Sequence, residues 1–575
     1  MENGKTDKNR KLYWVFFALL MAWIAFMGFY KLGVKYVDPW DEARHGVNAW
    51  EMLNGGSMVQ STFLRQADYY NLKPPLSMWC IMIGLKIFSN PVIGLRFYSV
   101  ICYLIVCVLV ALFLRRFGDP ESLLGLAFLS VNMTPFLAHM IRAGDADSLY
   151  VLLFTVAMLA MMRIRDDHRF LYLCGLAFSL AFLTKSFHAM MIAAIGGLFL
   201  LCTKQLFSIK WKEWCIFILC IILPVLVWGL LRYRIDGTVF FIKMWETDVR
   251  GRTGGELHSN PSPFWYYASY YFGLMSGKLQ IYLWALLLVM AGLTLRLKDY
   301  LTTGKSKGDG KTDRKLAAND IIETDDDIES AEESEDGITA IADESEKKDS
   351  KDVKENGLHT FGGQEILGFI LWAVLPFVAF SAVSNKLLWY IYPCLVPLLA
   401  GAGVAAAGII KRLRVLTGKG ARTALTMAVS CCLAFLLLWY GAGTFKIVNA
   451  QTYNELQILM RSVAGDAKAI AVMGQMEGDV VLPSGGEVYT GCKAYVDYDG
   501  SKNTWEQQDV FIAEAYGNFE CCEGGVLAIY LDSFMSGKER LVFVERKMYE
   551  NCRPLYEDAK LIASTPRYLA FAKAY

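Results

Sequence analysis

Charged residues are scarce in this 575-residue chain: Asp, Glu, Lys and Arg make up 20% of it, and hydrophobic residues make up 55%. The formal net charge is only +1, so the chain lacks the basic excess typical of nucleic-acid-binding proteins. Charge is missing altogether from long stretches, such as residues 12–30, 97–114, 122–141 and 214–231. A soluble protein of this length would divide into several domains rather than into such runs.

The uncharged runs have the length of membrane-spanning helices. A helix needs roughly 20 apolar residues to cross the hydrocarbon layer, and backbone polar groups inside it must bond within the helix. We therefore predict an all-α polytopic membrane protein. About eleven spans are expected, near residues 12–30, 97–114, 122–141, 148–162, 170–184, 186–203, 214–231, 279–295, 366–384, 388–410 and 423–445.

Basic residues indicate the topology, because cytoplasmic loops carry an excess of Lys and Arg. A basic segment precedes the first span, which is too long for a typical signal peptide and lacks a small-residue cleavage site, so we expect it to be retained. Alternate turns are also basic, at residues 115–116, 163–169, 204–212, 296–298 and 411–414. This pattern predicts a multi-pass protein of the plasma (inner) membrane, with a cytoplasmic N-terminus and an extracytoplasmic C-terminus.

The same pattern divides the chain into domains. Residues 1–297 form a membrane domain with extracytoplasmic loops at 31–96 and 232–278, and residues 364–445 continue it. Between them, residues 298–363 form a cytoplasmic insertion, with sixteen acidic residues between Asn319 and Glu355. Such a composition cannot bury a core, which predicts a disordered, solvated linker; a docking tail is the alternative.

The C-terminal segment, residues 446–575, has a different composition. Helical periodicity alternates there with short β-rich runs, which predicts a small extracytoplasmic α/β domain. No nucleophile elbow, P-loop or zinc-ligand spacing is found in this segment. Outside the cytoplasm its cysteines can form one or two disulfides, and the adjacent pair leaves the connectivity open among Cys492, Cys521, Cys522 and Cys552.

The first outer loop begins with a dense group of ionisable residues. Asp38, Asp41, Glu42, Arg44 and His45 lie within eight residues, just after the first span. This is more than membrane anchoring requires, and a carboxylate here can act as a general base on a hydroxyl or an amine. A solvated turn with internal salt bridges is the alternative.

Further along this loop, Lys73 precedes Pro74 and Pro75. Prolines are favoured at the start of a helix, so Lys73 is expected at a helix entrance beside Tyr69 and Tyr70. Lysine is a point-charge partner for phosphate. An interfacial helix with an anchoring lysine is the alternative.

Other outer segments carry charges close to the membrane surface. Arg142, Asp145 and Asp147 share one short loop, where either a salt-bridged turn or a carboxylate left for function is expected. Lys185 and Lys386 are lone lysines at outer boundaries, and a phosphate on a membrane-borne ligand would give each a partner. The second outer loop adds Glu246, Asp248, Arg250, Arg252, His258 and an aromatic run at 264–267 that is also typical of an interface belt.

These outer segments together suit a substrate that combines a lipid tail, a phosphate and a polar group such as a sugar. At these residues the sequence resembles the GT-C class of polytopic glycosyltransferases, and in particular the dolichyl-phosphate-mannose protein mannosyltransferase-like family and the aminoarabinose lipid A transferases. The resemblance covers roughly residues 10 to 445. It rests on an ordered set of motifs: Asp41-Glu42 with Arg44, Lys73–Leu76 with Trp79, Arg142 with Asp145 and Asp147, Leu183–Lys185, and Lys386 with Tyr390 and Pro393.

The resemblance implies a polyprenyl-phosphate sugar as donor and an inverting transfer to an extracytoplasmic lipid, glycan or protein. It implies that Asp41 is the general base, with Glu42 as the rival. Lys73 and Lys386 would bind the donor phosphate, supported by Arg142 and Lys185. Acceptor-binding or structural roles would fall to Asp145, Asp147, Arg44, His258 and Tyr390.

One position departs from the family pattern. The lipid A transferases have an acidic residue, linked to metal binding, directly before the lysine of the Lys-Pro-Pro motif, and here that residue is Leu72. No cofactor is therefore firmly implied, and both a divalent metal and lipid A as acceptor are open to doubt. A transporter or flippase of a lipid-linked saccharide, and a non-catalytic scaffold presenting the C-terminal domain, are the competing hypotheses.

Overall fold

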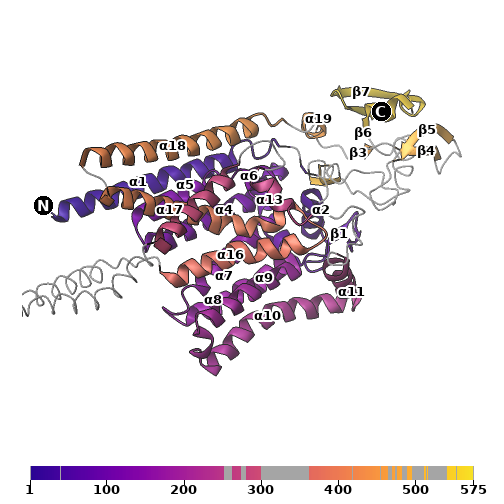
Figure 1. The fold of residues 1–575 in the computed structure, drawn as a ribbon. Coiled ribbons are helices and arrows are strands. Elements are labelled where there is room, and N and C mark those ends of the chain that lie inside the picture. Colours follow the sequence, from indigo (N-terminus) through magenta and orange to yellow (C-terminus); the bar gives the residue numbers. More distant parts are fainter. Residues whose placement is uncertain are drawn as a thin grey trace, which may run out of the picture.

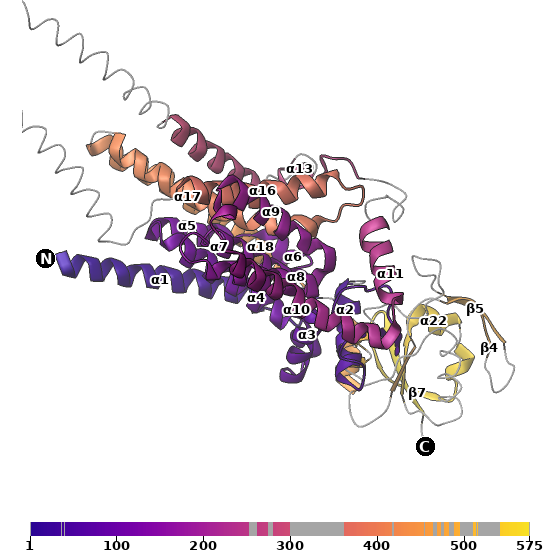
Figure 2. The same cartoon turned by 90° about the horizontal axis from the view of Figure 1, so that it is seen from below.

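The computed structural model contains a long helical bundle with a small β-containing region at one end (Figures 1 and 2). The N-terminus and C-terminus lie at opposite ends of the molecule in both views. The structure describes residues 2–35, 37–38, 41–251, 262–273, 280–298, 362–416, 419–452, 455–463, 469–472, 476–481, 488–494, 510–512, 514–515, 541–551 and 553–573. His258, Arg252, almost all of the acidic insertion, and Cys521, Cys522 and Cys552 lie outside these residues.

Eight helical stretches in the described chain are long and apolar enough to cross a membrane, which agrees with a multi-pass membrane protein. They are Arg10–Phe29 within α1 (Glu2–Phe29), Pro91–Arg115 (α4), Arg169–Cys202 (α8 and α9), Trp211–Asp236 (α10), Ile281–Lys298, Gly363–Ala382 (α16), Leu388–Leu413 within the turn and helix that include α17 (Tyr392–Leu416), and Thr423–Asn449 within α18 (Lys419–Asn449). Two shorter apolar helices are α3 (Leu76–Ile87) and α7 (Asp147–Met161).

One predicted span is broken into two helices. The span expected at 122–141 consists of α5 (Asp119–Leu129) and α6 (Met133–Leu137), separated by a break. Distant tyrosines satisfy the polar groups at the break: the Tyr103 hydroxyl donates to the Leu129 carbonyl at 2.6 Å, and the Tyr282 hydroxyl donates to Asn132 Oδ1 at 2.9 Å. The spans expected at 170–184 and 186–203 are α8 (Arg169–Lys185) and α9 (Met190–Cys202), which meet at Ser186, where φ is +45°.

Close helix packing in the bundle depends on glycine. A Cβ atom on Gly84 of α3 would lie 2.0 Å from the Gly94 carbonyl oxygen of α4, and one on Gly403 of α17 would lie 2.2 Å from the Gly125 nitrogen of α5. Small residues allow such close approach of membrane helices. The helix α18 runs beside α1 (Figure 1), and Phe445 contacts the rings of Phe26 and Tyr30 there.

Three short elements precede α3 and α4. They are α2 (Asp41–Leu53) and the two-stranded pair β1 (Thr62–Phe63) and β2 (Gln66–Ala67), followed by α3. After α10 the chain forms α11 (Val239–Trp245) and, further on, α13 (Tyr266–Tyr271). Figure 1 places α2, β1 and α11 at the end of the bundle that faces the C-terminal strands.

The C-terminal segment contains a mixed four-stranded sheet in the order β3-β6-β8-β7 (Ala469–Val472, Leu541–Glu545, Tyr568–Lys573, Ala559–Ser564). β3 and β6 are parallel, and the other two pairs are antiparallel. A separate antiparallel pair joins β4 (Met476–Val481) to β5 (Val488–Ala494), and the described helices are α19 (Glu455–Val463) and α22 (Arg546–Asn551).

Candidate functional site

A cavity of about 760 Å³ opens at the end of the bundle that carries α2. Segments that are far apart in sequence line it: the start of α2, residues 69–73, residues 137–147, the end of α8, residues 247–248 and residues 385–390. Most of the site residues expected from sequence are brought together here, namely Asp41, Arg44, Lys73, Asp145, Asp147, Lys185 and Tyr390. Glu42, Arg142 and Lys386 are not among the lining residues, and His258 lies outside the described residues.

Asp41 is the first residue of α2, where the helix dipole favours a carboxylate. Lys73 Nζ donates to Asp41 Oδ1 at 3.1 Å. Burial by itself would raise the pKa of the Asp41 carboxyl, but the positive charge of Lys73, with those of neighbouring histidines, lowers it overall. Asp41 is therefore an ionised carboxylate on the cavity wall, which is the state that a general base requires.

Lys73 occupies the helix entrance predicted from its prolines. Pro75 caps α3, and Lys73 precedes it on the cavity wall. Besides Asp41, Lys73 Nζ contacts Asn71 Oδ1 at 3.4 Å. Asn71 is fixed in turn because its amide donates to Asn48 Oδ1 of α2 at 2.7 Å. Two segments of the chain between α1 and α4 therefore hold the base candidate and the phosphate-ligand candidate side by side.

Arg44 lines the cavity, and its guanidinium is paired with a carboxylate. Its Nε donates to Asp68 Oδ2 at 2.9 Å, and its guanidinium lies 4.4 Å from the ring centre of Phe63 and 4.5 Å from that of Tyr70. Charge pairing and cation–π contacts of this kind stabilise a fixed orientation. Arg44 thus has a structural position beside the cavity.

Glu42 points into the protein core, unlike its neighbour Asp41. Arg96 of α4 binds it bidentately, with Nε to Oε1 at 2.6 Å and Nη2 to Oε2 at 2.8 Å, and both side chains are fully buried. Despite burial, the Arg96 charge lowers the pKa of Glu42 to about 2. This position does not fit the role of rival base, because the carboxylate is already fully engaged and away from the cavity.

Arg142 is also turned away from the cavity. Its Nη1 donates to the carbonyls of Met27, Gly28 and Tyr30 at 2.6–3.0 Å, and its Nη2 contacts Gln451 Oε1 at 3.0 Å. These carbonyls include the last turn of α1 and the start of the loop that follows it. The side chain satisfies a helix end, which does not fit the expected support of a donor phosphate.

The loop after Arg142 provides two carboxylates to the cavity, and both are paired. Asp145 Oδ2 lies 2.8 Å from Nδ1 of His139, and Asp147 forms an ion pair with Lys185. The Lys185 ammonium also lies 5.6 Å from the ring centre of Tyr390. Charges at the ends of α7 and α8 therefore meet at one wall of the cavity.

Lys386 lies just behind another wall. Its Nζ donates to the Ser262 carbonyl at 2.7 Å, while its neighbours Asn385 and Leu387 line the cavity. Burial lowers the pKa of Lys386. Its ammonium is therefore close to the cavity and bound to backbone.

No group of three or more His, Cys, Asp or Glu side chains within the described ranges is arranged to hold a metal ion. Leu72, which replaces the acidic residue of the related motif, lines the cavity with its apolar side chain.

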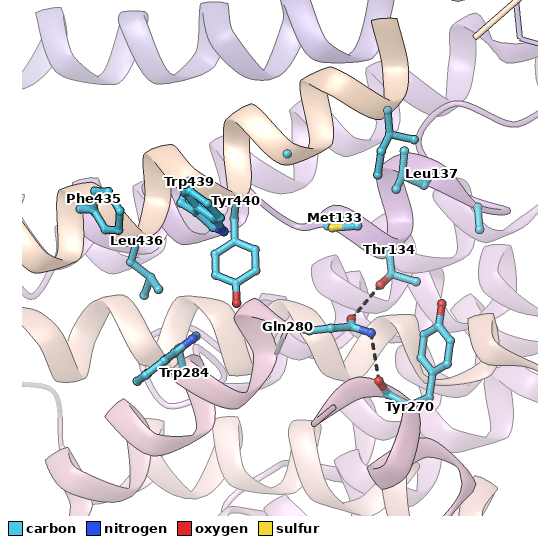
Figure 3. A pocket seen from close by; sticks show the side chains of 13 residues that line it. Met133, Thr134, Leu137, Tyr270, Gln280, Trp284, Phe435, Leu436, Trp439 and Tyr440 are labelled. Atoms are coloured by element: carbon cyan, nitrogen blue, oxygen red, sulfur yellow. Dashed lines mark hydrogen bonds between the residues drawn. The ribbon is translucent and has the colours of Figure 1, made fainter. Parts of the chain in front are cut away.

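A second cavity of about 800 Å³ adjoins the first, and both include Leu137 and Ala138 in their walls. Figure 3 shows Phe435, Leu436, Trp439 and Tyr440 of α18 on one side of it and Trp284 on the other. Gln280 is among its polar residues, and its Nε2 donates to the Tyr270 carbonyl at 2.9 Å. A groove of aromatic and aliphatic side chains suits an apolar chain.

Comparisons with known proteins agree with this architecture. Residues 72–228 match the family model described as dolichyl-phosphate-mannose-protein mannosyltransferase. The crystal structure of ArnT from Cupriavidus metallidurans in the apo state has the same fold, with a TM-score of 0.53, 13% identity and 97% coverage of both chains. The undecaprenyl-phosphate-bound form of that protein gives a TM-score of 0.52 at 15% identity, covering 97% of this chain and 98% of the other. The chain is therefore similar in fold to ArnT and, over part of its length, similar in sequence to dolichyl-phosphate-mannose-protein mannosyltransferases and aminoarabinose transferases.

Two curated relatives have the printed name undecaprenyl phosphate-alpha-4-amino-4-deoxy-L-arabinose arabinosyl transferase. The one from Pseudomonas paraeruginosa is 27% identical over 272 residues, which is 45% of this chain and 47% of the relative. The one from Shewanella sediminis is 25% identical over 396 residues, which is 67% of this chain and 58% of the relative. The chain spans about half the length of the first curated relatives it matches.

The sequence motifs did not single out two aromatic residues of this cavity. His139 and Trp389 stack on each other in its wall, with ring centres 3.6 Å apart. His139 was hidden because it lies inside the uncharged run 122–141, which was interpreted as one span. An ionisable side chain in an apolar run is itself a signal of function, and it is the one that finds this residue.

Proposed function

We propose that this chain is a membrane glycosyltransferase that transfers a sugar from a polyprenyl-phosphate donor to an extracytoplasmic acceptor, with inversion. The observation that carries the proposal is the Asp41–Lys73 contact of 3.1 Å at the wall of a cavity large enough for a sugar phosphate. The relatives named above act, by their printed names, on an undecaprenyl phosphate sugar. A base and a phosphate ligand side by side are the two groups that such a transfer needs.

In the proposed mechanism, the donor phosphate attracts the Lys73 ammonium, which shifts from Asp41 toward the phosphate oxygens. Asp41 then accepts the proton of the acceptor hydroxyl or amine as that atom attacks the anomeric carbon from the face opposite the phosphate. The bond between the anomeric carbon and the phosphate oxygen breaks, and its electron pair stays on the phosphate. Lys73, with Lys185 nearby, stabilises the departing anion.

We assign the other expected residues according to their contacts. Asp147 positions Lys185 through their ion pair, and Lys386 supports residues 385–387 of the cavity wall. Tyr390 orients the Lys185 ammonium. Glu42 and Arg142 act as structural residues that hold the outer loops, since both bind elements of the core.

The second cavity is proposed to hold the polyprenyl chain of the donor. It lies beside the first, with Leu137 and Ala138 common to both, so a phosphate near Lys73 and an apolar chain against α18 can belong to one ligand. An isoprenoid chain gains free energy by leaving water in proportion to the apolar area that it buries. The aromatic lining of α18 provides that area.

The proposed topology has eleven crossings, with the N-terminus cytoplasmic and residues 446–575 as an extracytoplasmic α/β domain of an inner-membrane protein. This topology places the basic turns predicted from sequence on the cytoplasmic side, including Arg116, which forms an ion pair with Asp166. In this topology residues 298–363 are a cytoplasmic insertion. Cysteine labelling that placed Asp41 and Lys386 in different compartments would refute both the topology and the shared site.

The test of the proposed activity is Asp41→Asn. Membranes with the wild type should transfer sugar from undecaprenyl-phosphate sugar to envelope acceptors, as followed by mass spectrometry, and the variant should lose at least about 100-fold in rate. Asp166→Asn, which changes a half-exposed carboxylate far from the cavity, is the matched control. Wild-type rates in Asp41→Asn would remove Asp41 from the mechanism, and lipid translocation without transfer in vesicles would instead support a flippase.

A further inference from the structure

His139 has an unusual backbone conformation at the wall of the cavity. It follows α6 directly, and its φ is +52°, in the left-handed region that few residues with a Cβ adopt. Neighbours hold this conformation: the Tyr392 hydroxyl donates to the Ala138 carbonyl at 2.9 Å, and the Ile141 amide donates to the Pro135 carbonyl at 2.8 Å. Such strained positions persist where surrounding contacts fix them, and they gather at functional sites.

Two contacts also fix the His139 ring. Asp145 Oδ2 lies 2.8 Å from Nδ1, and the Trp389 ring stacks on the imidazole at 3.6 Å with an interplanar angle of 21°. Asp145 is itself buried, and the Tyr98 hydroxyl donates a hydrogen bond to its backbone carbonyl, which fixes the position of the residue. A carboxylate bonded to Nδ1 fixes the orientation of an imidazole. Nε2 is then the nitrogen on the opposite edge of a ring that lines the cavity.

The charge of His139 follows from its surroundings. Burial by itself would lower the pKa of the imidazole, but the carboxylates of Asp145, Asp41 and Asp147 raise it to about 9. At neutral pH the ring is therefore a cation with an N–H donor at Nε2. A group in this state cannot serve as a base, whereas it can bind and stabilise an anion.

We propose that His139 is a second cationic ligand of the donor phosphate and donates its Nε2–H to a phosphate oxygen as the sugar leaves. The proposal rests on the proposed function. The carbon–oxygen bond to the phosphate breaks, its electron pair stays on the phosphate, and the acceptor proton goes to Asp41. The phosphate changes from a diester with one negative charge to a monoester with about two, so no proton has to leave His139.

This change of charge separates the role of His139 from simple donor binding. Because negative charge on the phosphate grows during the reaction, a fixed cation at Nε2 stabilises the transition state and the product more than the bound donor. The variant His139→Asn should therefore lower kcat more than it raises KM for the donor. It should also weaken binding of the product class, a polyprenyl phosphate monoester.

The direct test measures binding of undecaprenyl phosphate to the purified full-length protein in nanodiscs. Loss of one charge-assisted hydrogen bond should weaken the affinity of His139→Asn about tenfold or more. The matched control is His168→Asn, because His168 forms a comparable pair with Glu213 at 3.0 Å that contributes nothing to the cavity. Its affinity should equal that of the wild type.

The pH dependence provides a readout that a merely structural role would not give. The imidazolium exists below its folded pKa and is lost above it, so wild-type affinity should fall as the pH rises through about 9. In His139→Asn this alkaline limb should vanish. In Asp145→Asn, which removes the principal charge raising the pKa, the limb should move to lower pH.

The outcomes separate the two hypotheses. If the wild type binds undecaprenyl phosphate and His139→Asn binds it equally well with the same alkaline limb, the role of His139 is refuted while the proposed function stands. If the wild type does not bind it at all, the proposed function falls and the inference falls with it. If His139→Asn does not fold, the shift of the limb in Asp145→Asn decides, and an unshifted limb refutes the inference.

Discussion

Glu42 and Asp41 are adjacent carboxylates, and removing the charge of each should affect protein stability to very different extents. Glu42 accepts two hydrogen bonds from Arg96 at 2.6 and 2.8 Å, one from the Gly144 amide at 2.7 Å and one from the Asp38 amide at 2.8 Å. It therefore links the loop after α1, the start of α2, α4 and the loop before α7. The perturbation is Glu42→Gln, which keeps the shape of the side chain and removes its charge.

The expected cost follows from burial. Both Glu42 and Arg96 have fully buried side chains, so the substitution leaves a buried guanidinium without its counter-ion. Removing one partner of a buried ion pair costs about 3–5 kcal/mol, a large part of the roughly 5–15 kcal/mol that stabilises a typical domain. The glutamine NH₂ also faces a backbone N–H where an acceptor was needed, which adds to the cost.

Asp41→Asn should be far milder in its effect on stability. The side chains of the Lys73–Asp41 pair are 20% and 33% exposed, so water screens their interaction and stabilises either residue alone. A partly exposed pair of this kind contributes less than the fully buried Glu42–Arg96 pair. Both variants should therefore lose activity, Glu42→Gln through instability and Asp41→Asn through chemistry.

Thermal or denaturant unfolding of the purified proteins in the same detergent distinguishes the two effects. Glu42→Gln should unfold at a clearly lower midpoint than Asp41→Asn, which should stay near the wild type. The double variant Glu42→Leu with Arg96→Met, which replaces the pair by apolar groups, should recover much of the loss. A Glu42→Gln protein that is as stable as the wild type but inactive would refute this reasoning, and it would support Glu42 as the catalytic base.

Two further substitutions test the packing that places the site. Arg142→Ala should lower the free energy of unfolding by about 3 kcal/mol or more, because it leaves backbone carbonyls at the end of α1 without their donor. The affinity of the folded fraction for undecaprenyl phosphate should stay within about twofold of the wild type. A stable variant that lost affinity would contradict this. Gly84→Ala should destabilise the α3–α4 contact strongly, since its Cβ would lie 2.0 Å from the Gly94 carbonyl oxygen. The control is Gly197→Ala, whose Cβ would meet nothing within 4 Å, and it should leave the unfolding midpoint unchanged or slightly raised. Equal midpoints for the two glycine variants would contradict the close approach.

The helical bundle could be predicted from sequence because its signal is local. An uncharged run has to satisfy its own backbone in a membrane, so its length and position indicate a helix without reference to any other segment. The break between Leu129 and Met133 could not be found in this way. Tyr103 and Tyr282 supply the hydrogen bonds that make the break tolerable, and they come from helices elsewhere in the chain.

Some residues of the candidate site could be placed from local sequence, whereas others depend on distant partners. The helix entrance beside Lys73 was predictable, since the Pro-Pro pair that follows it marks the start of α3. The direction of Glu42 was not, because consecutive residues of a helix point about 100° apart and only a distant partner decides which one faces the core. Arg142 lies in a loop, and its direction depends on the carbonyls of Met27 and Gly28, which are distant in sequence. For Glu42 that partner is Arg96, 54 positions along the chain.

The pairing of charges in the cavity also bears on when the base is active. Among the described lining residues, Lys73, Lys185 and His139 each contact a carboxylate, respectively of Asp41, Asp147 and Asp145. A phosphate that draws Lys73 away removes the charge that lowers the pKa of Asp41, so under the proposed mechanism donor binding itself raises the proton affinity of the base. Without donor, Asp41 is held by Lys73 as a weak base. The chain would then deprotonate an acceptor only when a sugar is in place to receive it.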